Sequence, residues 1–133
     1  GDPMIKSKQR QKMNEVMRRR MMHDVPQADV IVTNPTHIAV ALKYNALEAP
    51  APVVVAKGAD LVAERIKKIA RENNVPIREN KPLARALYKD VEIGEMIPEN
   101  LYQAVAAILA SLSKFKKKPA ASITPQGKGI TVK

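Results

Sequence analysis

Four consecutive residues of this sequence could do chemistry on their own backbone: residues 34–37 read Asn-Pro-Thr-His. An asparagine usually degrades when the backbone nitrogen of the next residue attacks its side-chain amide. Proline has no backbone N–H, so this route is closed at Asn34. The reverse route stays open, in which the side-chain nitrogen of Asn34 attacks the carbonyl carbon of the same residue. The Asn34–Pro35 bond then breaks and leaves a C-terminal succinimide and a new N-terminus at Pro35.

This attack needs a rigid setting, because an amide nitrogen is a weak nucleophile. Well-oriented intramolecular groups reach effective molarities on the order of 10⁵–10⁸ M, and a strained turn adds roughly 1–3 kcal/mol of ground-state destabilisation. His37 is a candidate to take the amide proton or to protonate the leaving nitrogen. Thr36 is a candidate to position the turn or to bond the developing oxyanion. The alternative is an ordinary turn, since Asn and Pro are common in turns and need no further task.

The four residues lie between two short apolar runs, residues 29–33 and 37–43, that predict strands. A third run of this kind covers residues 53–56. The three runs are continuous rather than alternating, which predicts burial on both faces. Because only a turn separates the first two, they predict an antiparallel hairpin with Asn34 and Pro35 at its tip.

Helices and strands alternate in the remainder of the chain. A helix is predicted over residues 59–73 and a short fourth strand over residues 75–78, so residues 53–78 form a strand-helix-strand unit that we expect to be right-handed and parallel. Two further helices are predicted over residues 81–90 and 98–115. The predicted fold class is therefore α/β: a small mixed four-stranded sheet flanked by helices on both faces, preceded by a long basic N-terminal linker helix.

The N-terminal segment, residues 4–23, contains no Gly and no Pro and predicts that basic helix, with Asp2 and Pro3 at its start. It has a narrow apolar stripe, which consists of Met13, Val16, Met17 and Met21. Two interpretations stay open. The helix either docks its stripe on the folded body or leads away from the body toward a membrane or a partner.

The net charge of +10 lies at the two ends of the chain. Residues 1–25 have seven Lys or Arg against three Asp or Glu, residues 26–113 have ten of each, and residues 114–133 have six Lys and no acid. A DNA-reading domain usually has its positive charge on the folded body. Basic ends on a neutral body favour a juxtamembrane segment and a solvated tail instead.

We therefore expect three regions. Residues 1–25 form a basic juxtamembrane linker helix, residues 26–115 form the α/β domain, and residues 116–133 form a disordered basic tail, because periodicity is lost there. No run of about 18 apolar residues exists, so no membrane span is expected, and no signal peptide is visible. The chain opens with Gly rather than Met, and we expect a fragment or a processed product.

The composition also excludes several kinds of site. There is no Cys, so disulfides, thiolate metal sites and cysteine nucleophiles are absent. The two histidines have no suitably spaced carboxylates, so we expect neither a metal nor a cofactor. No Gly-rich phosphate loop and no nucleophile elbow is present.

The chain resembles the FlhB/YscU family of type III protein export, and within it the cytoplasmic domain of the flagellar export switch proteins. The resemblance rests on residues 34–37 within "TNPTHIAVALKY", on "AKGA" at residues 56–59 and on "PLARALY" at residues 82–88. It covers about residues 2–113, and its start resembles the family's stretch just after the last membrane helix.

The resemblance implies that Asn34 cyclises, that Pro35 becomes the new terminus, and that Thr36 and His37 assist. It also implies a cut domain that stays assembled while the export machine switches from rod and hook subunits to filament subunits. Such proteins act on the cytoplasmic side of the bacterial inner membrane, with the full-length protein in the membrane. The implied partners are other export-gate membrane proteins, the hook-length ruler protein, export substrates and chaperones, and the export ATPase complex.

Three other functions stay open. A non-cleaving interaction module of a virulence-type secretion system would share the fold and never cut. A basic nucleic-acid-binding α/β domain is disfavoured by the neutral body, the single Phe and the absence of Trp, so no nucleic acid is expected. A conventional enzyme is disfavoured by the absent motifs. We expect single-turnover self-cleavage and no turnover of an added substrate.

Overall fold

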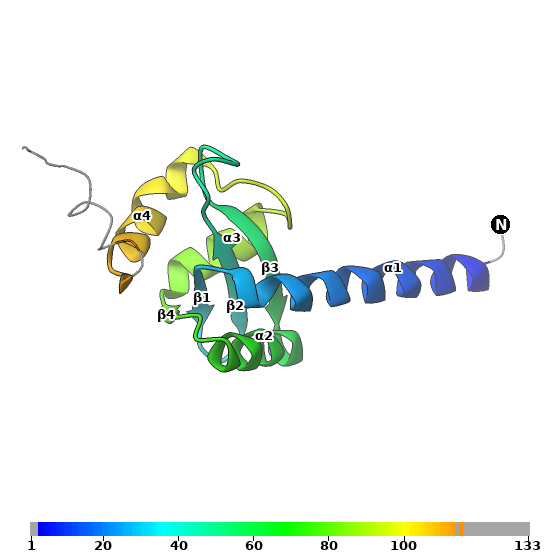
Figure 1. Ribbon diagram of the computed structural model, residues 1–133. Helices are drawn as coiled ribbons and strands as arrows, with labels where there is room; N and C mark the ends of the chain where they lie inside the picture. Colours follow the sequence, from blue (N-terminus) through cyan, green and yellow to red (C-terminus); the bar gives the residue numbers. More distant parts are fainter. Residues whose placement is uncertain (1–2, 114, 116–133) are drawn as a thin grey trace, which may run out of the picture. The chain divides into compact units, whose positions relative to one another are not determined.

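The computed structural model of the chain describes residues 3–113 and 115. Its helices and strands, shown in Figure 1, are α1 (Pro3–Asp24), η1 (Val25–Gln27), β1 (Val30–Asn34), β2 (Ile38–Lys43), β3 (Val53–Ala59), α2 (Asp60–Glu72), β4 (Ile77–Glu79), α3 (Lys81–Asp90), η2 (Glu99–Leu101) and α4 (Tyr102–Ala110). The chain divides into two compact units between Ile97 and Pro98. The predicted α/β class with a four-stranded mixed sheet is confirmed.

The sheet has the strand order β3-β2-β1-β4. β1 and β2 pair antiparallel, from Val30 opposite Leu42 to Asn34 opposite Ile38, which confirms the predicted hairpin. β2 and β3 are also antiparallel, and β1 and β4 are parallel. β3 and β4 therefore run in the same direction at the two edges, as the strand-helix-strand pattern predicts. The hairpin that ends at Asn34 lies at the centre of the sheet.

The two central strands are buried on both faces. All five residues of β1 and the four inner residues of β2 are buried, as predicted. The same prediction is wrong for residues 53–56, because Val53 and Val55 are only half-buried. The reason is that β3 is an edge strand with a bulged register, which shifts against β2 between Ala41 and Leu42. An edge strand has a neighbour on one side only, so its residues are covered less completely.

The fourth strand begins at Ile77, two residues later than predicted. The N–H of Val75 bonds the carbonyl of Ala70 and so still belongs to the end of α2. Pro76 has no N–H to give to a ladder, and its carbonyl accepts from the N–H of Ile31 at 2.9 Å. Regular pairing with β1 therefore starts one residue after the proline.

The predicted helix over residues 98–115 is shorter in the structure, where η2 and α4 cover residues 99–110. The buried side chains of this second unit keep the predicted helical spacing and are Leu101, Val105, Leu109 and Leu112. The tail predicted as disordered, residues 116–133, lies outside the described residues.

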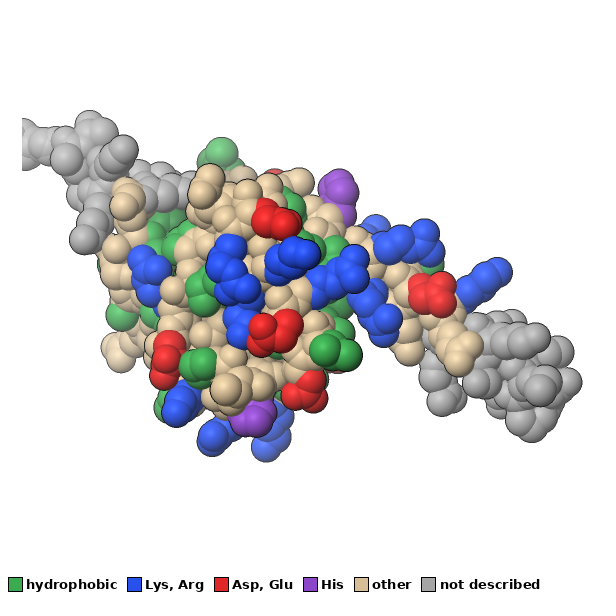
Figure 2. All heavy atoms as spheres, turned by 90° about the horizontal axis from the view of Figure 1, so that it is seen from below, with side chains coloured by type: hydrophobic (Ala, Val, Ile, Leu, Met, Phe, Trp, Pro, Cys, Tyr) green, Lys and Arg blue, Asp and Glu red, His purple; other side chains and the backbone are tan. Residues whose placement is uncertain are grey.

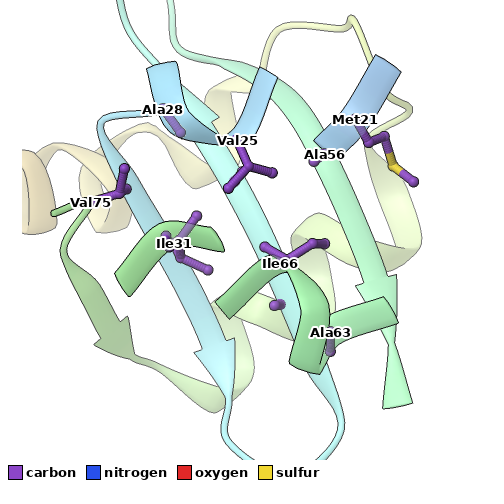
Figure 3. Packing of buried hydrophobic residues seen from close by; sticks show 11 residues of the cluster. Met21, Val25, Ala28, Ile31, Ala56, Ala63, Ile66 and Val75 are labelled. Atoms are coloured by element: carbon purple, nitrogen blue, oxygen red, sulfur yellow. The ribbon is translucent and has the colours of Figure 1, made fainter. Parts of the chain in front are cut away.

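An aliphatic core fills the space between α2 and one face of the sheet. It consists of Met21, Val25, Ala28, Ile31, Ala39, Ala41, Ala56, Ala63, Ile66, Ala70 and Val75. Figure 3 shows Ala63 and Ile66 of α2 directed at the strands. Ile66 is fully buried, and burial of such a side chain contributes about 1.5–3 kcal/mol. α3 packs against β1 and β2 from the other face and buries Leu83, Ala84 and Leu87.

α1 is anchored by its C-terminal end. Met21 is buried in the aliphatic core, whereas Met13, Val16 and Met17 are 72%, 60% and 49% exposed. Figure 1 shows the helix leading away from the sheet. The docking interpretation therefore holds for Met21, whereas the other three residues of the stripe do not dock on the body. That the helix leads toward a membrane or a partner stays a prediction. Within residues 3–113, no helix combines the length and the apolar content that crossing a membrane requires.

Gly58 allows α2 to approach β3 closely. It lies within β3, opposite Ala39 of β2. A Cβ atom at this position would lie 2.7 Å from the Cβ of Val62 and closer still to one of its methyl carbons. Even alanine would therefore push the first turn of α2 away from the strand. The missing side chain sets how near α2 lies to the sheet, and hence where its other side chains reach.

We expect Gly58→Ala to lower the free energy of unfolding by about 1–3 kcal/mol, because it overpacks this contact. Urea denaturation followed by circular dichroism measures the loss. Val62→Gly is the matched partner, because it removes both atoms that the new methyl group would meet. The double variant should lose less free energy than the two single variants together, and strictly additive losses would contradict the close approach.

Candidate functional site

Residues 34–37 form the tight turn at the tip of the central hairpin. Asn34 is the last residue of β1, and its carbonyl accepts the N–H of His37 at 2.9 Å, which closes a four-residue turn. Pro35 occupies the second position of this turn, where its fixed φ is favourable. β2 begins at Ile38, one residue later than predicted. His37, the first residue of the predicted run 37–43, therefore lies in the turn and not in the strand.

The four predicted site residues differ in burial. Asn34 is 8% exposed, Pro35 is half-buried, and Thr36 and His37 are exposed. Across the part of the chain that the structure describes, the carboxamide of Asn34 makes no hydrogen bond. The same holds for the Thr36 hydroxyl and the His37 ring. The turn thus brings the four residues together along the backbone, while the side chains of Thr36 and His37 are exposed to solvent.

The backbone carbonyls of this turn are held from four directions. The carbonyl of Asn34 accepts from His37 within the turn. Three nearby carbonyls accept from outside the turn. The carbonyl of Thr33 accepts from the N–H of Asn80 at 3.0 Å, and that of His37 from the N–H of Asp60 at 2.9 Å. The carbonyl of Pro35 accepts from the Nζ of Lys67 at 2.8 Å. Three of these donors lie outside the turn: Asp60 and Lys67 belong to α2, and Asn80 caps α3. Together they fix the path of the chain through the turn.

Asn80 joins the start of α3 to the end of β1. Its side chain caps the helix by accepting the N–H of Leu83 at 3.2 Å, and Pro82 follows in the first turn, a common arrangement at helix starts. Its backbone N–H is then free for the carbonyl of Thr33, one residue before Asn34. The capping residue thereby links α3 to the turn formed by residues 34–37.

Asp60 joins the start of α2 to the other side of the turn. The last β2–β3 pair is Ile38 with Ala59, so Asp60 is the first residue beyond the ladder. Its φ of 52° lies in the left-handed region, which costs energy for a residue with a side chain. The N–H of the same residue donates to the carbonyl of His37. The strained backbone of Asp60 thus lies at the contact between the start of α2 and His37 of the turn.

Lys67 reaches the turn from the second half of α2. Its side chain is 12% exposed, and its Nζ contacts both the Pro35 carbonyl at 2.8 Å and Oε2 of Glu64 at 2.7 Å. Glu64 is 59% exposed. Its pKa is lowered, first by the hydrogen bond from Lys67 and then by the charge of Lys67. The pair therefore holds a cation against the residue on the leaving side of the Asn34–Pro35 bond.

Sequence reasoning missed these three contacts. The signal for Lys67 was present, because it follows Ala63 by four residues and precedes Ala70 by three, and both alanines are buried. That spacing puts the base of the Lys67 side chain at the edge of the buried face. For Asp60 and the backbone of Asn80 no sequence signal identifies the partner, since both contacts depend on the packing of helices against the sheet.

The arrangement suits attack on the Asn34 carbonyl. The attacking amide and the carbonyl belong to one residue, and no described residue occupies the amide by hydrogen bonding. The His37 N–H already points at the oxygen that would gain negative charge, which is the requirement for stabilising an oxyanion. Within the described residues, no cluster of His, Asp and Glu is suited to hold a metal ion.

The comparisons with known proteins agree on one family. The profile described as "FlhB HrpN YscU SpaS Family" matches residues 1–112. The chain is 54% identical over 118 residues to the flagellar biosynthetic protein FlhB of Bacillus subtilis (strain 168), an alignment that covers 89% of this chain and 33% of that protein. The chain thus spans about a third of the length of the curated relatives it matches.

Solved structures show the same fold. The crystal structure of the cytoplasmic domain of FlhB from Shewanella putrefaciens is 52% identical, with a TM-score of 0.68 over 70% of this chain and 71% of that one. An EscU C-terminal domain with an asparagine replaced by alanine is 38% identical, with a TM-score of 0.65 over 67% of this chain and 89% of that one. Other EscU structures replace the proline just after that asparagine, or the histidine two positions after the proline. Residues 34, 35 and 37 have these types at this spacing.

The ion pair beside the turn predicts the titration of Glu64. Lys67→Met should raise the pKa of Glu64, because the hydrogen bond and the charge that lower it are both removed. The contribution of a carboxylate with a lowered folded-state pKa is complete above its unfolded-state pKa and is lost as the pH falls through the folded-state value. An NMR titration of the side-chain carboxyl carbon measures the change. Lys81→Met is the control and should leave the midpoint in place, and an unmoved midpoint in Lys67→Met would contradict the pair.

Proposed function

The chain belongs to the FlhB HrpN YscU SpaS family, and from this premise we propose that it cuts itself once, at the Asn34–Pro35 bond, by cyclisation of Asn34. The observation that carries the proposal is the turn itself. A buried carboxamide without a hydrogen-bond partner among the described residues belongs to the same residue as a carbonyl that accepts the His37 N–H. The EscU variants lend support, since their substitutions fall on an asparagine, a proline and a histidine at the matching spacing.

The step balances without a protease or a water nucleophile. Nδ2 of Asn34 forms a bond to the carbonyl carbon of Asn34 and closes a five-membered ring. The bond from that carbon to the nitrogen of Pro35 breaks. Nδ2 loses one proton and the Pro35 nitrogen gains one, so the two products together have the composition of the starting chain. We assign the proton transfer to His37, whose exposed ring is free to rotate, and the positioning of the turn to Thr36.

The cut domain should stay assembled. The broken bond lies outside the β1–β2 ladder, whose pairs run from Val30 with Leu42 to Asn34 with Ile38. The inner residues of both strands are buried, and each buried aliphatic side chain contributes about 1.5–3 kcal/mol. The main changes are local: a free turn and a new charged N-terminus at Pro35, which a partner could detect.

We propose that this change acts in a type III export apparatus and switches it from rod and hook subunits to filament subunits. The family and the flagellar relatives support this assignment. The chain would then act on the cytoplasmic side of the bacterial inner membrane, with residues 1–25 as linker, 26–115 as switch domain and 116–133 as tail. Its partners would be the other export-gate membrane proteins, the hook-length ruler protein, export substrates with their chaperones, and the export ATPase complex.

The surface charge does not favour the nucleic-acid alternative. On the face shown in Figure 2, Lys and Arg gather along α1, whereas positive and negative side chains are mixed over the body. Residues 26–113 have as many acids as bases. A duplex-binding face needs a continuous positive surface on the folded domain, and this body offers none on that view.

Intact-mass spectrometry of freshly translated chain tests the cleavage. We expect the wild type to convert into two fragments, residues 1–34 and 35–133. Cyclisation makes the first fragment one water lighter than the free acid before its ring opens, whereas hydrolysis by a protease gives the free acid at once. Asn34→Ala should stay whole, because no amide remains to attack, and Asn45→Ala, another loop asparagine, should cut like the wild type. A wild type that stays whole, or an Asn34→Ala chain that cuts, would contradict the mechanism.

We expect His37→Ala to slow cleavage by about 10²-fold, the range of general acid-base catalysis, without abolishing it as Asn34→Ala does. Intact-mass spectrometry over time measures the rate at which each chain converts into its two fragments. His23→Ala is the control, since that ring lies in α1. Equal rates for His37→Ala and the wild type would show that the ring has no part in the reaction.

A further inference from the structure

Lys67 is a charged side chain that contacts the turn and is neither the attacking group nor the proton carrier of the proposed cleavage. The Nζ of Lys67 donates to the carbonyl of Pro35 at 2.8 Å, although the side chain is only 12% exposed. Removing most of an ammonium group from water is unfavourable unless its partners replace the lost hydration. Here a backbone carbonyl and the carboxylate of Glu64 at 2.7 Å replace it. The contact joins α2 to the first residue beyond the bond that breaks.

The backbone at Pro35 shows what this contact can do. Two torsions set the direction of this residue, and the proline ring already fixes φ near −65°. The remaining torsion, ψ, turns the Pro35 carbonyl relative to the Asn34–Pro35 bond. A charge-assisted hydrogen bond to that carbonyl restrains ψ, and such bonds are stronger than neutral ones. Both torsions of the leaving residue are thus restrained.

The attacking side is restrained by other means. Asn34 is paired with Ile38 in the ladder, and its carbonyl accepts the N–H of His37. An intramolecular attack is fast only when both the attacking atom and the leaving group keep their geometry. The ladder and the His37 N–H fix the backbone and the carbonyl of Asn34, whose side chain is confined by burial. The Lys67 contact restrains the leaving side.

We propose that Lys67 is a positioning residue for the cut, because it holds the Pro35 carbonyl and thereby orients the leaving nitrogen. This inference rests on the proposed self-cleavage. Lys67 takes no proton and forms no bond in the reaction. Glu64 orients the ammonium from the solvent side and contacts the turn only through it.

The cleavage rate of the full chain tests the proposal. Lys67→Met keeps the aliphatic stem and removes the donor, and we expect the rate to fall about 10- to 100-fold, as for a small misplacement of reacting groups. Lys67→Arg keeps a charged donor and should recover most of the rate. Lys68→Met is the matched control on an exposed position of the same helix and should cut like the wild type. Glu64→Gln should slow the cut less than Lys67→Met.

A second readout is independent of the rate. In the uncleavable Asn34→Ala background, the carbonyl carbon of Pro35 should change its NMR shift when Lys67 becomes Met and should stay in place when Lys68 does. Circular dichroism and thermal melting show whether each variant folds, and Lys67→Gln replaces Lys67→Met if the latter does not.

The outcomes separate the two proposals. A wild-type chain that never cuts contradicts the proposed function and this inference with it. A wild-type chain that cuts, together with an unchanged rate in Lys67→Met, contradicts this inference alone. A slowing that Lys67→Arg does not reverse, or one that Lys68→Met shares, would mark Lys67 as a general structural contact and would also overturn it.

Discussion

The tight turn between β1 and β2 depends on hydrogen bonds to its own carbonyls. Four carbonyl oxygens between Thr33 and His37 accept from donors on His37, Lys67, Asp60 and Asn80. These donors come from the turn, from α2 and from the start of α3, so the turn keeps its shape only while both helices are packed on the sheet. The packing of α2 and α3 on the sheet thus restrains the backbone on both sides of the Asn34–Pro35 peptide bond. A reaction as slow as asparagine cyclisation benefits from such restraint.

The same structure tolerates an unfavourable feature at its centre. A buried polar group without a partner costs free energy, and the Asn34 carboxamide has none among the described residues. The left-handed backbone of Asp60 adds strain nearby. The buried aliphatic residues of β1, β2 and α2 offset both costs. That core lies away from the Asn34–Pro35 bond, so under the proposed mechanism it would hold the two pieces together after the cut.

The central hairpin was predictable because its signals are local: two continuous apolar runs separated by one short turn. The half-buried state of Val53 and Val55 was not, because it follows from the edge position and the bulge of β3. Helical spacing places Lys67 at the edge of the buried face of α2, but it does not say which residue the side chain contacts. The partners of Lys67 and Asp60 in the turn depend on where α2 begins and on how closely Gly58 lets it approach. Sequence therefore proposes residues 34–37 as the reacting residues, and only the structure identifies the contacts that restrain them.

The account's central claim is that the fold, and not the four residues alone, drives the cut. The most direct measurement compares cleavage of freshly translated chain in native buffer with cleavage in urea concentrated enough to unfold it, at the same pH and temperature. We predict cleavage in native buffer and no cleavage on the same timescale in urea, with cleavage returning when the urea is removed. Cleavage at an equal rate in the unfolded chain would contradict the claim.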